Sequence, residues 1–480
     1  MRTAAKEPSG NVPVDVRAAR LPSVEAVLGG EGGAALKEFS RPAVLDAARR
    51  ALAGLRERLR SGEELADSEL TAAAVASIAE RMLALSSAPA LTRVINATGV
   101  VLHTNIGRAV LCDAAIEAAA LAAGASVNLE YDLATGGRGD RDLLVEEHLC
   151  ALTGAEAATV VNNNAAGVLL ALHTLAASRE VVVSRGELVE IGGSFRIPEI
   201  MKASGAVLRE VGTTNRTHPA DYRDAIGADT ALLMKVHASN YRIVGFASSV
   251  DLAELSKLAK QHAGIVVVED LGSGAVVDLS ALGLAPEPTI AASLRAGADL
   301  VLASGDKLLG GPQCGIVAGR RDIVERLRRS PLKRAVRCDK MTLAALEATL
   351  RVYRFSPRPE QEIPTLRYLR RGLEELRRVG EEALGLLGAR LGPRWAFELV
   401  ESRAETGSGS QPNVAIASLA IAVAADGLTA AAIEQRFRAS QPPILGRIHD
   451  DRFVLDLRTI DDPHDLVPHW PRPDANWADQ

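Results

Sequence analysis

The chain of 480 residues has few aromatic side chains and no long apolar run. Aromatic residues make up only 3% of it, so a broad platform of rings for stacking bases is not expected. No apolar stretch approaches the ~20 residues that a membrane helix needs, so no membrane span is expected. Residues 1–20 lack an apolar core and carry charges of both signs, which argues against a signal peptide.

Cysteine and histidine are also sparse, and their spacing predicts neither a metal site nor a disulfide framework. The nine histidines form no metal constellation, so no bound metal is expected. The four cysteines form no CxxC pair and fit a reducing cytoplasm, where we expect the protein to reside. They are Cys112, Cys150, Cys314 and Cys338.

The net charge of −5 argues mildly against a nucleic-acid-binding protein, but this average conceals two basic clusters. Each cluster is either a solvated helix face or a contact surface for a phosphate backbone. The first, on an amphipathic helical stretch, holds Arg41, Arg49, Arg50, Arg56, Arg58 and Arg60. The second holds Arg320, Arg321, Arg326, Arg328, Arg329, Lys333, Arg334 and Arg337.

Hydrophobic patterning predicts an α/β fold built on a mainly parallel sheet. Short β-type runs alternate with helical segments through the middle of the chain, and no internal repeat is detected. The expected strands lie at 158–161, 180–183, 231–235, 265–268 and 300–302.

Composition shifts divide the chain into five segments. Breaks at Ser40 to Pro42, at Ser61-Gly62 and at Arg354 to Pro359 mark turns or joints. The segments are a loosely ordered N-terminus (1–20), a helical N-terminal module (21–88), a large domain (89–353), a small α+β C-terminal domain (354–460) and a disordered, Pro- and Asp-rich tail (461–480).

One lysine, Lys307, occupies a glycine-rich loop directly after the apolar run 299–303. An earlier strand ends in an acid, Asp270, and one helical crossover separates the two. An amine for the aldehyde and an acid for the ring nitrogen suit pyridoxal phosphate (PLP). The alternative is a glycine-rich loop that merely lies beside a lysine. Asp306 is a rival acid, but neighbours on a loop usually point apart, which favours Asp270.

Asparagines 162–164 stand between a predicted strand and a predicted helix. Exposed amides at a helix N-terminus, helped by Asn162 and Asn163, would form a cradle for the cofactor phosphate. For Asn164 a capped turn is as plausible as direct contact. Ser304, at the end of the lysine strand, is a weaker phosphate candidate.

From about Leu21 to Leu350, the chain resembles the bacterial selenocysteine synthases, the L-seryl-tRNA(Sec) selenium transferases. The resemblance thins after Arg354. The matching blocks are 21–24, 94–108, 128–132, 161–165, 184–198, 211–216, 235–246, 269–274, 304–313 and 332–340.

This resemblance implies a fold-type I PLP-dependent transferase whose helical N-terminal module binds tRNA. It implies a Schiff base between PLP and Lys307, which then acts as the general base, and it pairs Asp270 with the pyridine nitrogen. Arg108, Arg334 and Arg337 match anion-binding positions that would hold selenophosphate. The alternative for Arg108 is a surface salt-bridge partner. The family assembles as a decamer built from dimers, with active sites between subunits, so these arginines could serve a neighbour's lysine.

The implied reaction converts L-seryl-tRNA(Sec) to L-selenocysteinyl-tRNA(Sec) by β-elimination to dehydroalanyl-tRNA and addition of selenium from selenophosphate. Two alternatives stay open: a PLP-dependent lyase or aldolase acting on a small amino acid or amino sugar phosphate, and a non-catalytic tRNA-binding protein. Arg138, in a glycine-rich loop, is a candidate contact for the tRNA end. His103 and His237 fall in matching blocks, but a lone histidine is more often structural.

Overall fold

The computed structural model describes residues 20–29, 35–191, 195–238, 241, 243 and 245–470. Residues 1–92 and 93–480 form two compact units. Of the N-terminus predicted to be loosely ordered, all but Arg20 lies outside the described residues. Within the described part of the chain, no helix is long and apolar enough to cross a membrane.

The first unit is helical and has its own apolar core. Its longest helix begins after Ser40, with Pro42 in the first turn, and ends before Ser61, so both predicted breaks are helix ends. Leu52, on that helix, and Val75 lie in the core. The elements are α1 (Val24–Gly29), η3 (Ala35–Glu38), α2 (Arg41–Arg60), η4 (Asp67–Leu70) and α3 (Ala72–Ser87).

A seven-stranded sheet forms the centre of the second unit, in the order β2-β10-β9-β8-β7-β3-β6. Only β10 is antiparallel to its neighbours, so the predicted mainly parallel sheet is confirmed. The strands are β2 (Ala157–Val161), β3 (Glu180–Ser184), β6 (Val207–Val211), β7 (Thr230–Val236), β8 (Val266–Gly272), β9 (Leu300–Ser304) and β10 (Gly315–Gly319).

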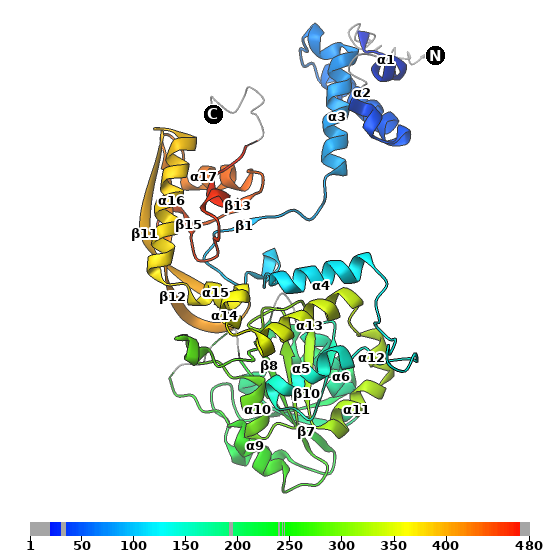
Figure 1. Cartoon of the computed structure of the whole chain (residues 1–480), viewed down its shortest axis with the longest axis vertical. Coiled ribbons are helices and arrows are strands. Elements are labelled where there is room, and N and C mark those ends of the chain that lie inside the picture. The colour runs from blue at the N-terminus through cyan, green and yellow to red at the C-terminus, as the bar shows by residue number, and fades with distance from the viewer. Residues whose placement is uncertain are drawn as a thin grey trace, which may run out of the picture. The chain divides into compact units, whose positions relative to one another are not determined.

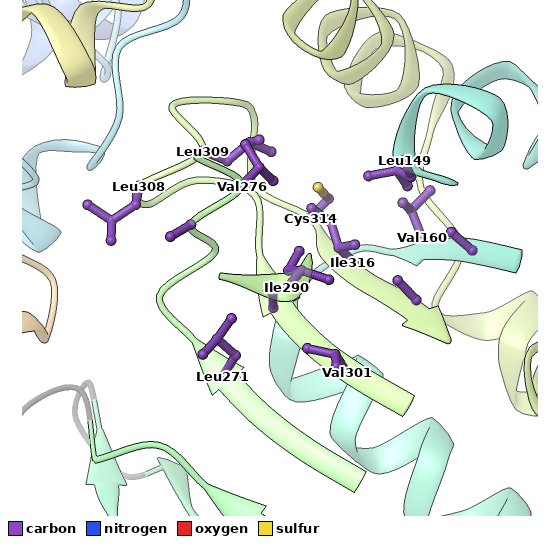
Figure 2. Close-up of a cluster of buried hydrophobic side chains, with 14 of the residues drawn as sticks. Leu149, Val160, Leu271, Val276, Ile290, Val301, Leu308, Leu309, Cys314 and Ile316 are labelled. Carbon is purple, nitrogen blue, oxygen red and sulfur yellow. The ribbon is translucent and has the colours of Figure 1, made fainter. Parts of the chain in front are cut away.

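Successive residues of the buried strands enter two different apolar clusters because side chains alternate across a sheet. On β9, Val301 belongs to one cluster and Leu302 to the other. Figure 2 shows part of the first cluster, where Val160 of β2 and Ile316 of β10 lie beside Leu149. The sheet is therefore covered on both faces, as a mainly parallel sheet requires.

Helices cover both faces, and α4 packs along α13 (Figure 1). They are α4 (Asp113–Gly124), α5 (Leu143–Thr153), α6 (Asn164–Ala176), α7 (Ile197–Ser204), α8 (Pro219–Ala225), α9 (Leu252–Ala259), α10 (Ile290–Ala296), α11 (Arg321–Arg329), α12 (Pro331–Ala335) and α13 (Lys340–Phe355). Shorter elements are η5 (Thr104–Ile106), η6 (Arg185–Glu187), η7 (Leu279–Leu282), β4 (Glu190–Ile191) and β5 (Phe195–Arg196).

After α13 the chain builds a four-stranded antiparallel sheet, in the order β11-β12-β15-β14. The strands are β11 (Trp395–Gly407), β12 (Ser410–Ala425), β14 (Arg447–His449) and β15 (Arg452–Asp456). The accompanying elements are α14 (Pro359–Glu362), α15 (Pro364–Arg370), α16 (Leu373–Leu391), α17 (Ala430–Arg438), β13 (Ile444–Leu445) and η8 (Pro463–Leu466).

Two predicted segment boundaries need correction. Strand β1 (Ile95–Asn96), assigned from the sequence to the large domain, pairs with β13 and contributes Ile95 to the core of the C-terminal sheet. The segment predicted to be a disordered tail is ordered at least to residue 470, since Leu466 is fully buried and Trp470 stacks on Trp395. Burial of these apolar side chains orders the segment, although its overall composition is polar and rich in proline. Residues 471–480 lie outside the described part.

Candidate active site

Asp270 and Lys307 meet at the carboxyl edge of the central sheet, because β8 and β9 are parallel neighbours. Asp270 is inside β8, and Lys307 follows the end of β9 by three residues. Both line one cavity of about 230 Å³. A hydrogen bond from the backbone N–H of Leu308 to the carbonyl of Ser273 joins the lysine loop to the acid loop.

A glycine is required where these two loops approach each other. Gly274 has a φ of 74°, and a Cβ at this position would lie 1.9 Å from the carbonyl oxygen of Ser304. Any side chain there would push the acid loop away from the end of β9. Gly274, which follows β8, therefore allows the acid loop and the lysine loop to pack this closely.

Lys307 is buried, with 5% of its surface exposed. Desolvation lowers the pKa of its amine, and the positive charge of Arg108 lowers it further. Asp270, Asp306 and Glu287 oppose this shift. A lysine in this environment holds a larger fraction of neutral amine, the form that attacks a carbonyl or accepts a proton.

The Asp270 carboxyl is also buried, and desolvation raises its pKa. The side-chain amide of Asn164 donates a 2.8 Å hydrogen bond to Oδ1 of Asp270, which counteracts the shift, as does the charge of Lys307. The amide oxygen of Asn164 and the hydroxyl of Ser273 are buried without a hydrogen-bond partner among the described residues. These two buried polar atoms are therefore available for hydrogen bonds to a ligand.

Asp306, the rival acid, is engaged elsewhere. Its carboxylate accepts a 2.7 Å hydrogen bond from the guanidinium of Arg108, 198 residues earlier in the chain. Arg108, with a φ of 63°, lines the cavity of Lys307, whereas Asp306 is not among the lining residues. Asp270 is therefore the acid that this cavity exposes.

The three asparagines have three different positions at the start of α6. Asn163 is the N-cap, and its side chain accepts from the N–H of Ala166 at 2.9 Å. Asn164 contacts Asp270, so the predicted alternative that Asn164 caps a turn is wrong. The side chain of Asn162 is exposed and outside the cavity, while its backbone N–H donates to Val336.

This helix start leaves backbone donors free. The N–H groups of Asn164 and Ala165, in the first turn of α6, donate to no acceptor among the described residues, and both residues line the cavity. Unsatisfied N–H groups at the start of a 13-residue helix attract an anion. Ser304 lines the same cavity.

Arg334 and Arg337 lie in another cavity of the same chain, of about 590 Å³. This cavity, here called the basic cavity, shares no lining residue with the cavity of Lys307. Arg138 also lines it, and Arg337 lies 3.5 Å from Glu130. Within one chain, therefore, Arg108 lies with Lys307, but the other two predicted anion-binding arginines do not.

Of the two histidines in matching blocks, only His237 reaches the cavity of Lys307. Its Nε2 lies 3.2 Å from the buried carboxylate of Glu287. His103 caps a 3₁₀ turn through Nδ1. The sequence alone does not predict which of these two histidines lies in the site. It also does not predict Glu287, because this residue is 50 positions from its partner His237.

Comparison with known proteins decides the family. The profile described as L-seryl-tRNA selenium transferase matches residues 94–461, and the profile described as selenocysteine synthase N terminal matches residues 18–56. The L-seryl-tRNA(Sec) selenium transferase of Geobacter metallireducens is 49% identical over 92% of this chain and 96% of its own. That of Edwardsiella ictaluri is 53% identical over 81% and 84%.

The chain belongs to the L-seryl-tRNA selenium transferase family. A Rhizobium meliloti protein named for the same activity is 47% identical over 94% of this chain and 96% of its own. Among solved structures, that of D-glucosaminate-6-phosphate ammonia-lyase superposes with a TM-score of 0.56 at 21% identity. It covers 80% of this chain and 95% of the lyase, and at that identity the likeness shows the fold alone.

Membership of the selenium transferase family indicates PLP as the cofactor. The residues fit the group: a buried amine, a buried carboxylate and an anion-binding helix start surround one cavity. The buried amide oxygen of Asn164 that lacks a partner is a further place where a bound molecule would complete the hydrogen bonding.

Proposed function

We propose that this protein converts L-seryl-tRNA(Sec) to L-selenocysteinyl-tRNA(Sec), with PLP as cofactor and selenophosphate as selenium donor. Proteins named for this activity match more than nine-tenths of the chain. The observation that carries the proposal is the pairing of a buried amine and a buried carboxylate, Lys307 and Asp270, in one cavity at the carboxyl edge of the sheet.

Bound PLP supplies an electron sink that makes the α-proton of serine acidic and its β-hydroxyl a leaving group. Lys307 would hold the cofactor and would accept the proton from the α-carbon, since the lowered pKa of its amine favours the neutral form. Asp270 would pair with the ring nitrogen and keep it protonated. Asn164 orients the Asp270 carboxylate through their hydrogen bond.

The start of α6 is the proposed phosphate site. The free N–H groups of Asn164 and Ala165 would donate to the phosphate oxygens, and Ser304 would add a hydroxyl. Asn163 supports the site by capping the helix. Asn162, with its side chain outside the cavity, contributes through its backbone, which ties the loop to Val336.

Arg108, Arg334 and Arg337 form the proposed selenophosphate site, completed by two copies of the chain. The Arg108 guanidinium faces the cavity of Lys307, whereas Arg334 and Arg337 line the basic cavity. A partner chain that presents its basic cavity to this Lys307 would unite the three. Planar guanidinium groups bind a tetrahedral dianion with several parallel hydrogen bonds, which suits selenophosphate.

Exposed apolar side chains support association of several copies of the chain. The assembly that we propose is a decamer built from dimers. Five large aliphatic residues, from just before α4 to the first residue of α5, are 50% or more exposed, an unusual density for a solvated surface. They are Val110, Ile116, Leu121, Leu133 and Leu143. A second copy of the chain would bury them.

The first unit is the proposed tRNA-binding module, and the proposed tRNA substrate supports a cytoplasmic location. Arg41, Arg49 and Arg56 on α2 are exposed and have no carboxylate partner among the described residues. Arg58, in contrast, pairs with Glu63. Free guanidinium groups on one helix fit a phosphate backbone.

A direct test supplies the purified protein with seryl-tRNA(Sec), free serine or an amino sugar phosphate, each with selenophosphate. The proposal expects turnover of the aminoacyl-tRNA alone. Release of ammonia from either small molecule, with seryl-tRNA untouched, would make the protein a small-molecule lyase instead.

A further inference from the structure

A second polar cavity lies beside the cavity of Lys307, at the carboxyl ends of β3, β6 and β7. Its volume is about 380 Å³, and we call it the β3–β7 cavity. It shares Val236 and His237 with the cavity of Lys307, so the two have a common wall. The basic cavity shares no residue with either.

Hydrogen-bonded polar groups line the inner part of the β3–β7 cavity. The Lys235 ammonium lies 2.7 Å from Glu187, whose other oxygen accepts the N–H of Val236 at 3.0 Å. The hydroxyls of Ser184 and Thr217 lie 2.7 Å apart. An ammonium has three donors and each carboxylate oxygen two lone pairs, so this wall can still bind a ligand rich in hydroxyl groups.

Two loops at the cavity carry a cation and an aromatic residue: Arg216 lines the cavity, and Phe246 directly precedes the lining residue Ala247. The guanidinium of Arg216 is exposed and has no carboxylate partner within the described ranges. Phe246 is 87% exposed, and the side chain of Asn215 donates a 2.6 Å hydrogen bond to its carbonyl. A backbone hydrogen bond of 2.9 Å from Ser248 to Asn215 also joins the loops, so the backbone of Phe246 is held beside Asn215, which lines the cavity and precedes Arg216.

We propose that the β3–β7 cavity binds the terminal nucleoside of the aminoacylated tRNA. Lys235 and Glu187 would contact the ribose hydroxyls, Phe246 would stack on the base, and Arg216 would face the phosphate on its 5′ side. The inference rests on the proposed function. It extends that function by assigning a place to the part of the substrate nearest the reacting atoms.

The covalent structure of the substrate supports this position. The serine is esterified to the ribose, so only a few bonds separate the sugar from the α-carbon that Lys307 must reach. The nucleoside therefore needs a cavity that shares a wall with that of Lys307. Among the cavities found in the described residues around the site, the β3–β7 cavity meets this condition and the basic cavity does not.

The test uses the PLP-loaded full chain and a probe without a β-leaving group, 3′-deoxy-3′-(L-alanylamino)adenosine 5′-phosphate, with L-alaninamide as the probe without a nucleoside. Calorimetry measures both affinities. The proposal expects the adenosine probe to bind the parent more tightly. Phe246→Leu should weaken that binding at least about fivefold, whereas Phe246→Tyr should retain it, since stacking needs a ring. Alaninamide should bind the parent and both variants equally.

A matched control is Phe355→Leu, which removes another exposed phenyl ring, at the end of α13, whereas Phe246 directly precedes the lining residue Ala247. It should leave the adenosine probe at the parent affinity. With seryl-tRNA as substrate, Phe246→Leu should raise KM and leave kcat near the parent value, because the base does not react.

Equal affinities of the Leu and Tyr variants for the adenosine probe would overturn the nucleoside assignment. If the parent still converts seryl-tRNA in that case, the proposed function stands and only this cavity is wrongly assigned. A parent protein that does not convert seryl-tRNA would overturn the proposed function and, with it, the assignment of this cavity.

Discussion

The amide of Asn164 donates a hydrogen bond of 2.8 Å to the carboxylate of Asp270. The two residues are 106 positions apart and come from the first turn of α6 and from β8. The bond favours the ionised carboxylate, against the desolvation that raises the pKa of Asp270. The start of the helix thus connects the proposed phosphate site with the proposed partner of the ring nitrogen.

Replacing Asn164 with leucine should weaken PLP binding by roughly tenfold, the cost of about 1.4 kcal/mol for one lost hydrogen bond to a charged group. The carboxyl of Asp270 should then be protonated at a higher pH. Equilibrium dialysis of PLP against the cofactor-free protein measures the effect. Asn162→Leu is the matched control, since that side chain is outside the cavity. Equal losses in the two variants would contradict the role given to Asn164.

Burial of Lys307 should make the stability of the cofactor-free protein depend on pH. Its folded pKa is lowered from 10.5, so between the folded value and 10.5 the unfolded chain binds a proton that the folded chain does not. The stability of the parent therefore rises with pH through this window, by up to about 1.4 kcal/mol per pH unit. Lys307→Met, which has no charge to bury, lacks this contribution.

We therefore expect Lys307→Met to exceed the parent in stability most clearly near neutral pH, and the advantage to shrink as the pH approaches 10.5. Urea denaturation of both cofactor-free proteins across this range measures it. Lys202→Met, at an exposed position of α7, should show no such trend. A stability difference between Lys307→Met and the parent that does not vary with pH would contradict the assigned burial of charge.

The composite selenophosphate site predicts complementation between two inactive variants. Lys307→Ala lacks the amine, and Arg334→Ala should lose selenium transfer while retaining PLP. In hetero-oligomers, some sites combine an intact Lys307 with the partner's intact arginine. Refolding the two chains together should restore roughly a quarter of the parent activity, the statistical share of such sites in random dimers.

Lys307→Ala refolded with Asp270→Ala provides the control, because both residues line the same cavity of one chain. No site in that mixture holds both groups, so it should stay inactive. A mixture of Lys307→Ala and Arg334→Ala that is no more active than its separate components would argue that both groups act within one chain.

The free arginines of α2 should govern the salt dependence of tRNA binding. Replacing both Arg49 and Arg56 by alanine should reduce the slope of log affinity against log salt by about two, one for each lost phosphate contact. Filter binding over a salt series gives this slope. Arg58→Ala, which removes an arginine already paired with Glu63, should change it little. Parallel slopes for all three proteins would exclude this face as the tRNA contact.

Much of this architecture could be predicted from periodicity because the functional strands are apolar and end in polar residues. Both β8 and β9 follow this pattern, and Asp270 and Lys307 were identified from it. The strand Gly315–Gly319 was missed, since five small or apolar residues bounded by glycines resemble a turn until β2 and β9 pair with it.

Contacts over long separations could not be predicted in the same way. No local pattern pairs Arg108 with Asp306, or separates Arg108 from Arg334 into different cavities. The role of each asparagine before α6 depends on backbone angles: Asn163 is extended and caps the helix, which leaves Asn164 to contact Asp270. The spacing in the sequence identified the three asparagines as site candidates, but the contact that each one makes depends on the tertiary structure.

The most direct test of the central claim incubates the purified, PLP-loaded protein with seryl-tRNA(Sec), with and without selenophosphate, and identifies the amino acid then released from the tRNA. Lys307→Ala serves as the inactive control. The account predicts selenocysteine only when the parent protein and selenophosphate are both present. Recovery of unchanged serine from the parent with selenophosphate would contradict it.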